Sequence, residues 1–202
     1  MIEIVKKEDI VIPFDKIGDD NWDTKTREVI LSFADVWRKK LPEPKTDDEI
    51  NKLELNLGAK LPESLKLFYK TFGIAPIGEQ LLNFDEICWI KEIWAENPEY
   101  GPDFTDDDKT VLPYLITFSD YKGNGNMFCF HCDTKEIFFF DHDDKPYFTK
   151  LFDAVDDYLK GCLILCQTGF WGEGIGQEEV EQWAEEIVEE FYGRETLEKW
   201  RY

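Results

Sequence analysis

Three strand-like runs follow one another near the middle of the chain, and they constrain the fold more than any other feature. The runs are LPYLITFSD, NMFCFHCD and KEIFFFDH, which begin at residues 112, 126 and 135. Each is rich in aromatic and β-branched residues, and turn-forming residues separate them. Short connections of this kind join antiparallel strands. The sequence therefore predicts an antiparallel meander over about residues 112–142.

The connection between the first two runs contains two closely spaced glycines, in the order Lys122-Gly123-Asn124-Gly125-Asn126. A phosphate-binding loop has a longer spacing, ends in Gly-Lys-Ser/Thr and leads into a helix. Here a strand-like run follows instead. Because Gly and Asn tolerate positive φ, the segment is interpreted as a hairpin turn.

Helical periodicity flanks the meander on both sides. Thr46 and Glu49 have capping-box spacing, and the predicted helix ends at Gly58. A second helix begins at Pro62 and ends at Gly73. Further helices are predicted at 24–41, 148–166 and 177–193, short strands at 2–14, and a loop at 97–109. The expected fold class is α+β, with an antiparallel sheet flanked by helices.

The helix at 24–41 is expected to bury one row of apolar side chains, and the segment at 177–193 carries a longer apolar stripe. The first row is Val29, Phe33, Val36, Trp37 and Leu41. The second is Val180, Trp183, Ala184, Ile187, Val188, Phe191 and Tyr192. The second stripe could pack on the core or could dock a partner.

The charge balance is strongly acidic. Asp and Glu number 44 against 23 Lys and Arg, which gives a formal net charge of −21. Such a field repels nucleic acids and anionic membranes and attracts basic partners. No apolar run approaches the roughly 20 residues that span a bilayer. The first residues lack the apolar segment of a signal peptide, and the 5 Cys are an odd number. We therefore expect a cytoplasmic protein of one domain over residues 1–202.

The residues offer little chemistry for catalysis. Cys129, His131 and Cys132 are potential metal ligands, but in a strand the first two point to one face and Cys132 to the other. The chain has no second ligand pair and no nucleophile elbow. The cluster DHDD at 141–144 lacks the spacing of a calcium loop. We expect no catalytic residue, no metal and no cofactor.

The first helix pair carries a recognisable pattern. The string INKLELNLGAKLPESLKLFYKTFG begins at Ile50 and resembles the opening block of the SUKH superfamily, the Smi/Knr-like proteins. That block reads Ile-x-x-x-Glu-x-x-Leu-Gly-x-x-Leu-Pro and leads into a helix. The later string LPYLITFSDYKGNGNMFCFHCD is similar to the second block of the family, and it ends at Asp133.

The resemblance covers a core of about residues 46–162, with the closing helix at 148–162. Residues 1–45 form an N-terminal extension, and residues 167–202 form a C-terminal extension. Phe72 stands where the family usually has Asn, and the segment 84–110 is longer than usual. The resemblance implies an α+β fold with an antiparallel sheet flanked by helices, which agrees with the periodicity.

The resemblance also implies a function. Bacterial members are mostly immunity proteins that neutralise polymorphic toxins of nuclease or deaminase type, and fungal members are hub-like binding proteins linked to cell-wall control. The first hypothesis is therefore a non-catalytic protein that occupies the basic surface of a toxin domain. The alternative is a regulatory or scaffold protein whose partner docks on the C-terminal helix.

The predicted partner-binding residues fall into three groups. They are the hairpin-end residues Asp120, Asn124, Asn126, His131, Asp141, Asp143 and Asp144, the loop acids Asp106, Asp107 and Asp108, and the aromatic anchors Trp89 and Trp94. For each residue the alternative is a structural role: tryptophans in the core and acids that are merely solvated. The oligomeric state stays open.

Overall fold

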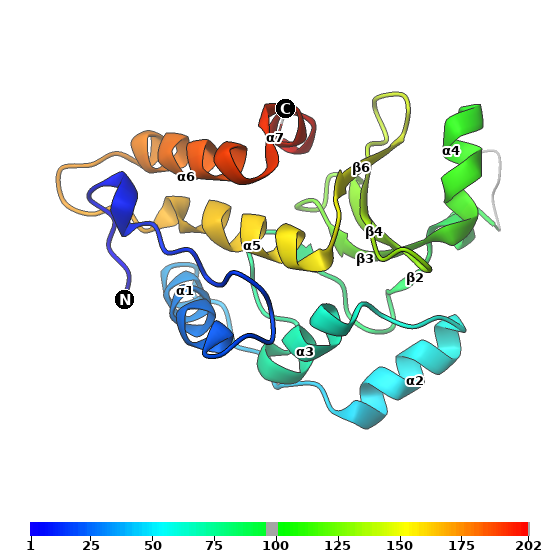
Figure 1. Ribbon diagram of the computed structural model, residues 1–202, viewed down its shortest axis with the longest axis horizontal. Coiled ribbons are helices and arrows are strands. Elements are labelled where there is room, and N and C mark those ends of the chain that lie inside the picture. The colour runs from blue at the N-terminus through cyan, green and yellow to red at the C-terminus, as the bar shows by residue number, and fades with distance from the viewer. Residues whose placement is uncertain (96–100, 202) are drawn as a thin grey trace.

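The computed structural model describes residues 1–95 and 101–201. Its fold class is α+β, as predicted, and one antiparallel sheet is surrounded by helices (Figure 1). The sheet has six strands in the order β1-β3-β4-β5-β6, and β2 pairs with a different part of β3. Its strands are β1 (Gln80–Leu81), β2 (Cys88–Trp89), β3 (Leu115–Asp120), β4 (Met127–His131), β5 (Ile137–Phe140) and β6 (Phe148–Phe152).

The predicted meander is confirmed as β3, β4 and β5, which pair in sequence order. The glycine segment between β3 and β4 is a hairpin turn, in which Lys122, Gly123 and Gly125 have positive φ. The prediction at 148–166 is wrong in its first part, because residues 148–152 form β6. Phe148 and Phe152 are four residues apart and both buried, and an i, i+4 pair of this kind is compatible with one face of a strand. A helix face has the same spacing.

Both faces of the sheet are buried. Phe118, Phe128, Phe130 and Phe139 point into the main hydrophobic core, which extends from Ile4 to Trp200. Strand residues that point to the other face belong to a smaller core. This core is formed by Ile90, Leu115, Cys129, Phe140 and Phe148. Because consecutive strand residues point to opposite faces, the aromatic-rich runs supply both cores at once.

The helix pair of the first block has the predicted form. Helix α2 (Asp47–Leu57) starts with the Thr46–Glu49 capping box and ends at Gly58 in the left-handed conformation. Helix α3 (Glu63–Phe72) follows, and its buried face is Leu65, Phe68, Tyr69 and Phe72. The two helices place their apolar faces against the main core.

Helix α1 (Trp22–Val36) is shorter than predicted and buries a different face. Its buried residues are Thr26, Val29, Ile30, Ser32 and Ala34, whereas Val36, Trp37 and Leu41 are exposed and Phe33 is half-buried. The helix stops because Arg38 adopts the left-handed conformation, and the amide of Lys39 donates to Ala34 O. The predicted strands at 2–14 are also wrong. That segment has only an isolated parallel bridge between Ile4 and Trp171 and a 3-10 helix at Lys7–Asp9.

The C-terminal half adds four helices. Helix α5 (Val155–Leu165) lies between α6 (Gln177–Tyr192) and α1 in Figure 1, and α7 (Arg194–Arg201) follows α6 after a sharp turn. The α6 stripe packs on the core through Val180, Ala184, Ile187 and Val188, while Phe191 is exposed. Helix α4 (Asp106–Val111) lies in the segment predicted as loop, of which residues 97–100 are outside the described residues. Within the described parts of the chain, every helix is too short or too polar to cross a membrane.

Candidate functional site

Two turns lie at the same end of the sheet, and we call this end the turn end. They are the β3–β4 turn at residues 121–126 and the β5–β6 turn at residues 141–147. In Figure 1 the β5–β6 turn stands between α7 and α4. Lys199 Nζ of α7 lies 2.8 Å from Asp141 Oδ2 and 3.0 Å from Asp144 Oδ2. On the other side, Lys145 Nζ lies 3.2 Å from Asp103 Oδ2, just before α4.

A groove of about 970 Å³ runs between the two turns and α7. Five of the predicted residues line it, namely Asn124, Asn126, Asp141, Asp143 and Asp144. The two turns are joined by Asn126 Oδ1, which accepts from the main-chain amide of His142 at 3.0 Å and lies 2.6 Å from His142 Nδ1. The structure therefore brings together side chains that are up to 20 positions apart in the sequence.

The acids of the β5–β6 turn are only partly free. Hydrogen bonds and the charge of Lys199 lower the pKa of Asp144. Asp141 is largely buried beneath the same ammonium group. Asp143 is well exposed, and among residues 1–95 and 101–201 its carboxylate pairs only with His142 Nε2, at 3.2 Å. Exposed pairs of this kind contribute little, so the Asp143 carboxylate stays available to a partner.

The predicted loop acids separate into two kinds. Asp106 and Asp107 lie exposed in the first turn of α4. Asp108 is buried, because its Oδ2 accepts from the amide of Thr105 at 2.8 Å and its Oδ1 from the amide of Phe148 at 2.9 Å. Burial raises the pKa of Asp108, but these hydrogen bonds outweigh burial and keep it below the ordinary value. Asp108 therefore holds α4 on β6 and has no free oxygen to offer at the surface.

Asp120 also has an internal role. Its Oδ1 accepts from the amide of Gly123 and so closes the β3–β4 turn. In the same turn, Asn124 Oδ1 accepts from the amide of Asn126 at 2.9 Å. The side chain of Asn124 remains exposed, whereas Asp120 and Asn126 are half-buried.

His131 and Trp89 do not belong to the turn end. His131 is the last residue of β4 and lies opposite Leu115, next to the β4–β5 turn at residues 132–136. The indole N–H of Trp89 donates to Leu57 O at 2.9 Å, at the end of α2. We call this opposite end of the sheet, with the α2–α3 connection at 58–62, the far end. The expectation that His131 shares a surface with the hairpin acids is wrong, because β4 runs from one end to the other.

Trp94 lies nearer the turn end but is half-buried in the smaller core. Its ring contacts Phe104 at 5.4 Å and Phe140 at 5.3 Å between centroids. The tryptophans that expose about half of their surface are Trp37 and Trp171, at 55% and 54%. Neither was predicted, since periodicity placed Trp37 on the buried face of α1.

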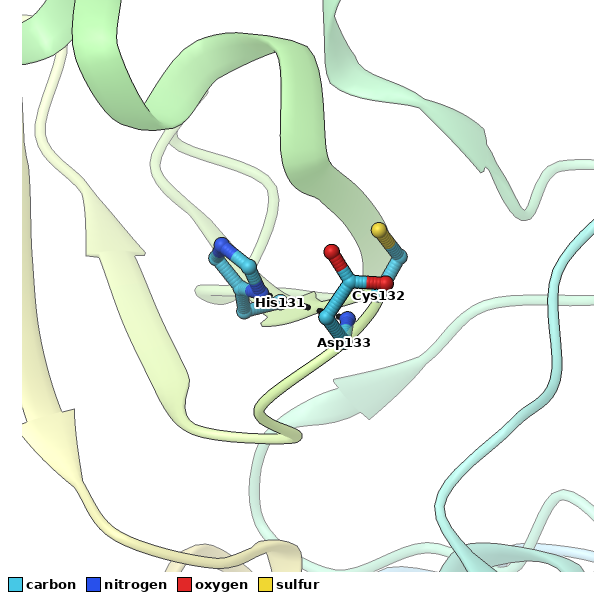
Figure 2. Close-up of side chains that lie close together, drawn as sticks. All are labelled: His131, Cys132 and Asp133. Carbon is cyan, nitrogen blue, oxygen red and sulfur yellow. Dashed lines mark hydrogen bonds between the residues drawn. The ribbon is translucent and has the colours of Figure 1, made fainter.

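Figure 2 shows the one arrangement among the described residues with metal-ligand spacing: His131, Cys132 and Asp133, whose ligand atoms lie within 4.8 Å of one another. The strand argument is wrong for Cys132, because β4 ends at His131 and Cys132 starts the turn. His131 Nδ1 accepts from the amides of Asp133 and Thr134, each at 3.2 Å. Burial and the Asp133 carboxylate raise the pKa of the Cys132 thiol. A metal ion would have to displace those hydrogen bonds and deprotonate that thiol.

A buried carboxylate organises the far end. Glu54 Oε2 lies 2.5 Å from Lys60 Nζ, and its Oε1 accepts from the amide of Leu61 at 3.1 Å and lies 3.4 Å from Lys66 Nζ. Burial raises the pKa of Glu54, but these partners outweigh burial and lower it. The ammonium group of Lys135 in the β4–β5 turn donates to Lys60 O at 2.6 Å. The network thus ties the α2–α3 connection to the sheet.

Several side chains at the turn end were not predicted from the sequence. Arg194, Glu198, Lys199 and Arg201 all line the groove, and they come from α7, which periodicity did not identify as a separate helix. Arg201 lies 2.9 Å from Glu181 and 3.4 Å from Glu185 of α6. The alternation of basic and acidic residues after Gly193 was the available signal.

Comparisons with known proteins identify one family. A family model described as the SMI1 / KNR4 family (SUKH-1) matches residues 44–161, which is more than half of the chain. No curated protein and no solved structure matches the chain significantly. The matched segment runs from the residues before α2 into α5, so it contains the whole sheet and the Glu54 network. It leaves out α1, α6 and α7.

Proposed function

Because the chain belongs to the SMI1 / KNR4 family (SUKH-1), we propose that it is a non-catalytic immunity-type protein that binds a basic toxin domain in the cytoplasm. The toxin would be of nuclease or deaminase type, since these enzymes need a basic groove for nucleic acid. The protein occupies that groove with its turn end and so blocks the substrate.

The observation that carries this proposal is the convergence of exposed acids at the turn end. Asp106 and Asp107 begin α4, and Asp143 lies in the β5–β6 turn. The Lys145–Asp103 ion pair and the hydrogen bond from Phe148 to Asp108 hold these two segments against each other. Three exposed carboxylates from two neighbouring segments therefore lie at the turn end, and Asp143 also lines the groove.

Electrostatics favours a basic partner at this edge. With a net charge of −21, the whole molecule attracts a positively charged domain and raises the association rate. The local acids then orient the encounter. Because Lys199 compensates part of the charge of Asp141 and Asp144, we assign most of the attraction to Asp106, Asp107 and Asp143.

The test uses the toxin domain encoded beside this gene, purified in an inactivated form. Binding is measured by calorimetry for the wild type and for the triple variant D106N/D107N/D143N, at low and at high salt. The matched control is D19N/D20N/D35N, which changes the charge equally at exposed positions away from the turn end. We expect the first variant to lose at least about tenfold in affinity, and the control to lose about threefold or less.

Two results would contradict the proposal. If the wild type does not bind or neutralise the adjacent toxin, the immunity role is wrong. If both triple variants lose the same affinity, the attraction is a property of net charge and the turn end is not the interface.

The alternative, a scaffold protein that docks its partner on the α6 stripe, has less support. The central residues of that stripe, Val180, Ala184, Ile187 and Val188, are buried in the main core. Removing residues 177–202 should therefore unfold the protein rather than leave a folded protein without its partner. A folded deletion variant that has lost only partner binding would favour the scaffold role.

A further inference from the structure

A cavity of about 400 Å³ lies on the side of the molecule formed by the end of α1, the segment before β1, and α5, α6 and α7. It is separate from the exposed carboxylates of the turn end and shares only Arg201 with the groove. Its size is within the range of small-molecule sites, about 300–1,000 Å³. Neither the family pattern nor the proposed function uses it.

Glu79 is the unusual residue in this cavity. Its side chain is buried, with 7% of the residue exposed, and Oε2 has no hydrogen-bond partner among the described residues. The backbone at Gly78 packs closely against the end of α5, because a Cβ atom at this position would lie 2.9 Å from Cys166 Cβ. Because the backbone lies so close to α5, the next residue, Glu79, is buried in the wall of the cavity. A buried carboxylate oxygen without a donor is costly, so a ligand that supplies one would be stabilised.

Nearby positive charges offset the burial of the Glu79 carboxylate only in part. Burial raises its pKa to about 7, although Lys122, Arg201 and the indole N–H of Trp200 act in the opposite direction. Trp200 Nε1 is itself buried and has no hydrogen-bond partner within the part of the chain that the structure describes, so the indole lies near the Glu79 carboxylate without forming a hydrogen bond to it. Arg201 is already engaged by Glu181 and Glu185.

The cavity is lined by three basic and two acidic side chains, whereas the molecule as a whole is strongly acidic. Lys39 and Lys122 line it, and neither has an ion pair among residues 1–95 and 101–201. Lys39 follows the left-handed end of α1, and Lys122 occupies the β3–β4 turn beside Tyr121. In a chain with 44 acidic residues, two unpaired lysines beside one cavity favour an anionic group there.

Aromatic side chains supply a third kind of contact. Phe33 and Trp37 line the cavity, with their ring centroids 6.2 Å apart. Trp37 exposes 55% of its surface, although it is a large apolar residue. An exposed indole beside a cavity offers a face on which a planar ring can stack.

We propose that this cavity binds a small planar aromatic ligand that carries an anionic group and an N–H donor. The ring stacks on Trp37, Lys39 and Lys122 hold the anionic group, and Glu79 accepts from the N–H donor. A nucleoside monophosphate and a free aromatic amino acid share this chemistry. The experiment distinguishes these two sources.

The probes are adenosine 5′-monophosphate and L-tryptophan, each titrated by calorimetry into the full-length protein. Adenosine, which lacks the anionic group, is the comparison ligand. The variants are E79Q, K39A/K122A and W37L, with E28Q and K25A/K52A as matched controls at exposed positions away from the cavity. The triple variant D106N/D107N/D143N is a further control. Thermal unfolding of each variant confirms that it is folded.

We expect one of the two probes to bind with a dissociation constant below about 1 mM. K39A/K122A should weaken it at least about tenfold, because charge-assisted hydrogen bonds to the anionic group are lost. E79Q and W37L should each weaken it several-fold, and none of the controls should change it. If the nucleotide is the ligand, adenosine should bind at least about tenfold more weakly than the monophosphate.

The proposal is overturned if neither probe binds at millimolar concentration. It is also overturned if a probe binds equally well to the wild type, E79Q and K39A/K122A, since the ligand would then lie elsewhere. Binding of the nucleotide with the expected losses assigns the cavity to nucleoside phosphates, and binding of tryptophan assigns it to amino acids.

Discussion

The two ends of the sheet handle acidic side chains in opposite ways. At the far end, Glu54 is buried and both of its oxygens are occupied by Lys60, Lys66 and the amide of Leu61. At the turn end, Asp106, Asp107 and Asp143 are exposed at the surface. The far end contains the first of the two sequence blocks that resemble the family, and Glu54 and Leu61 of that block belong to a structural network. This block is therefore explained by folding and does not itself indicate a binding surface.

The ends also differ in what supports them. The far end rests on α2 and α3, inside the segment matched by the family model, whereas the turn end rests on α4, inside the segment, and on α7, outside it. Trp200 of α7 is buried against Phe128, Phe152 and Tyr158 of the matched segment. Its ring fills the space over Gly161, where a Cβ atom would lie 2.8 Å from Trp200 Cζ3.

The largest effect is expected from Trp200→Ala. Removing this buried indole should lower the free energy of unfolding by about 3–5 kcal/mol. Chemical denaturation followed by circular dichroism measures the loss, and W171A, at an exposed tryptophan, is the matched control. A loss below 1 kcal/mol would mean that α7 is an independent appendage, and the comparison between the two ends would fail.

Glu54→Gln tests the far end. The substitution leaves Lys66 without its buried partner, and we expect a loss of roughly 2–4 kcal/mol at pH 7. Because the folded-state pKa of Glu54 is lowered, its contribution is full above the unfolded value of about 4.5 and is lost as the pH falls through the folded value. The difference between wild type and variant should therefore shrink below pH 4. A difference that is constant from pH 7 to pH 3 would show that the charge of Glu54 is not responsible, and E28Q should show no difference at any pH.

Lys199→Ala tests whether the acids of the β5–β6 turn contribute to partner binding at the turn end. The variant frees Asp141 and Asp144, which should increase the affinity for a basic partner about three- to tenfold. Asp144 is exposed but Asp141 is largely buried, so the loss of both ion pairs should cost about 1–3 kcal/mol in stability. Calorimetry with the toxin domain measures the first effect and denaturation the second. If K199A weakens binding, Lys199 contacts the partner directly and the groove recognises more than positive charge.

The smallest effect is expected from His131→Ala at the far end. The imidazole accepts two main-chain hydrogen bonds in an exposed turn, so its removal should cost about 0.5–1 kcal/mol. Partner affinity should be unchanged, because His131 lies at the opposite end from the acids. Reduced affinity in a folded H131A variant would show that the interface extends to the far end.

The parts of the fold that were predicted correctly have local causes. The Thr46–Glu49 capping box, the glycines that end α2 and α3, and the turn at Gly123 and Gly125 are each specified within a few residues. The errors arise where distant contacts decide. Residues 2–14 were predicted as strands. Their amides and carbonyls instead form hydrogen bonds with α1 and with residues 167–172, for example between Val11 and Gln167. Helix α4 is an exception, because its Thr105–Asp108 capping box is local but lies in a segment that prolines, a glycine and three consecutive aspartates indicated as loop.

The candidate site shows the same division. The acids of the two turns could be selected from the sequence, since turns are exposed. That Asp108 is buried, that Lys199 covers Asp141, or that Glu79 faces a cavity depends on side chains far away in the chain. Nothing in the local pattern Ile77-Gly78-Glu79 distinguishes a buried glutamate from an exposed one.

The contacts that unite the two extremities of the chain also determine when the protein can finish folding. The amide of Ile4 donates to Phe170 O at 2.8 Å, and Lys7 Nζ lies 3.0 Å from Glu186 Oε2. During synthesis on a ribosome, the first residues therefore cannot form these contacts until residues some 160–180 positions later have been synthesised. Until Trp200 arrives, the aromatic side chains of β4 and β6 remain partly uncovered. Such late closure raises the contact order, which slows folding relative to a helical protein built from local contacts.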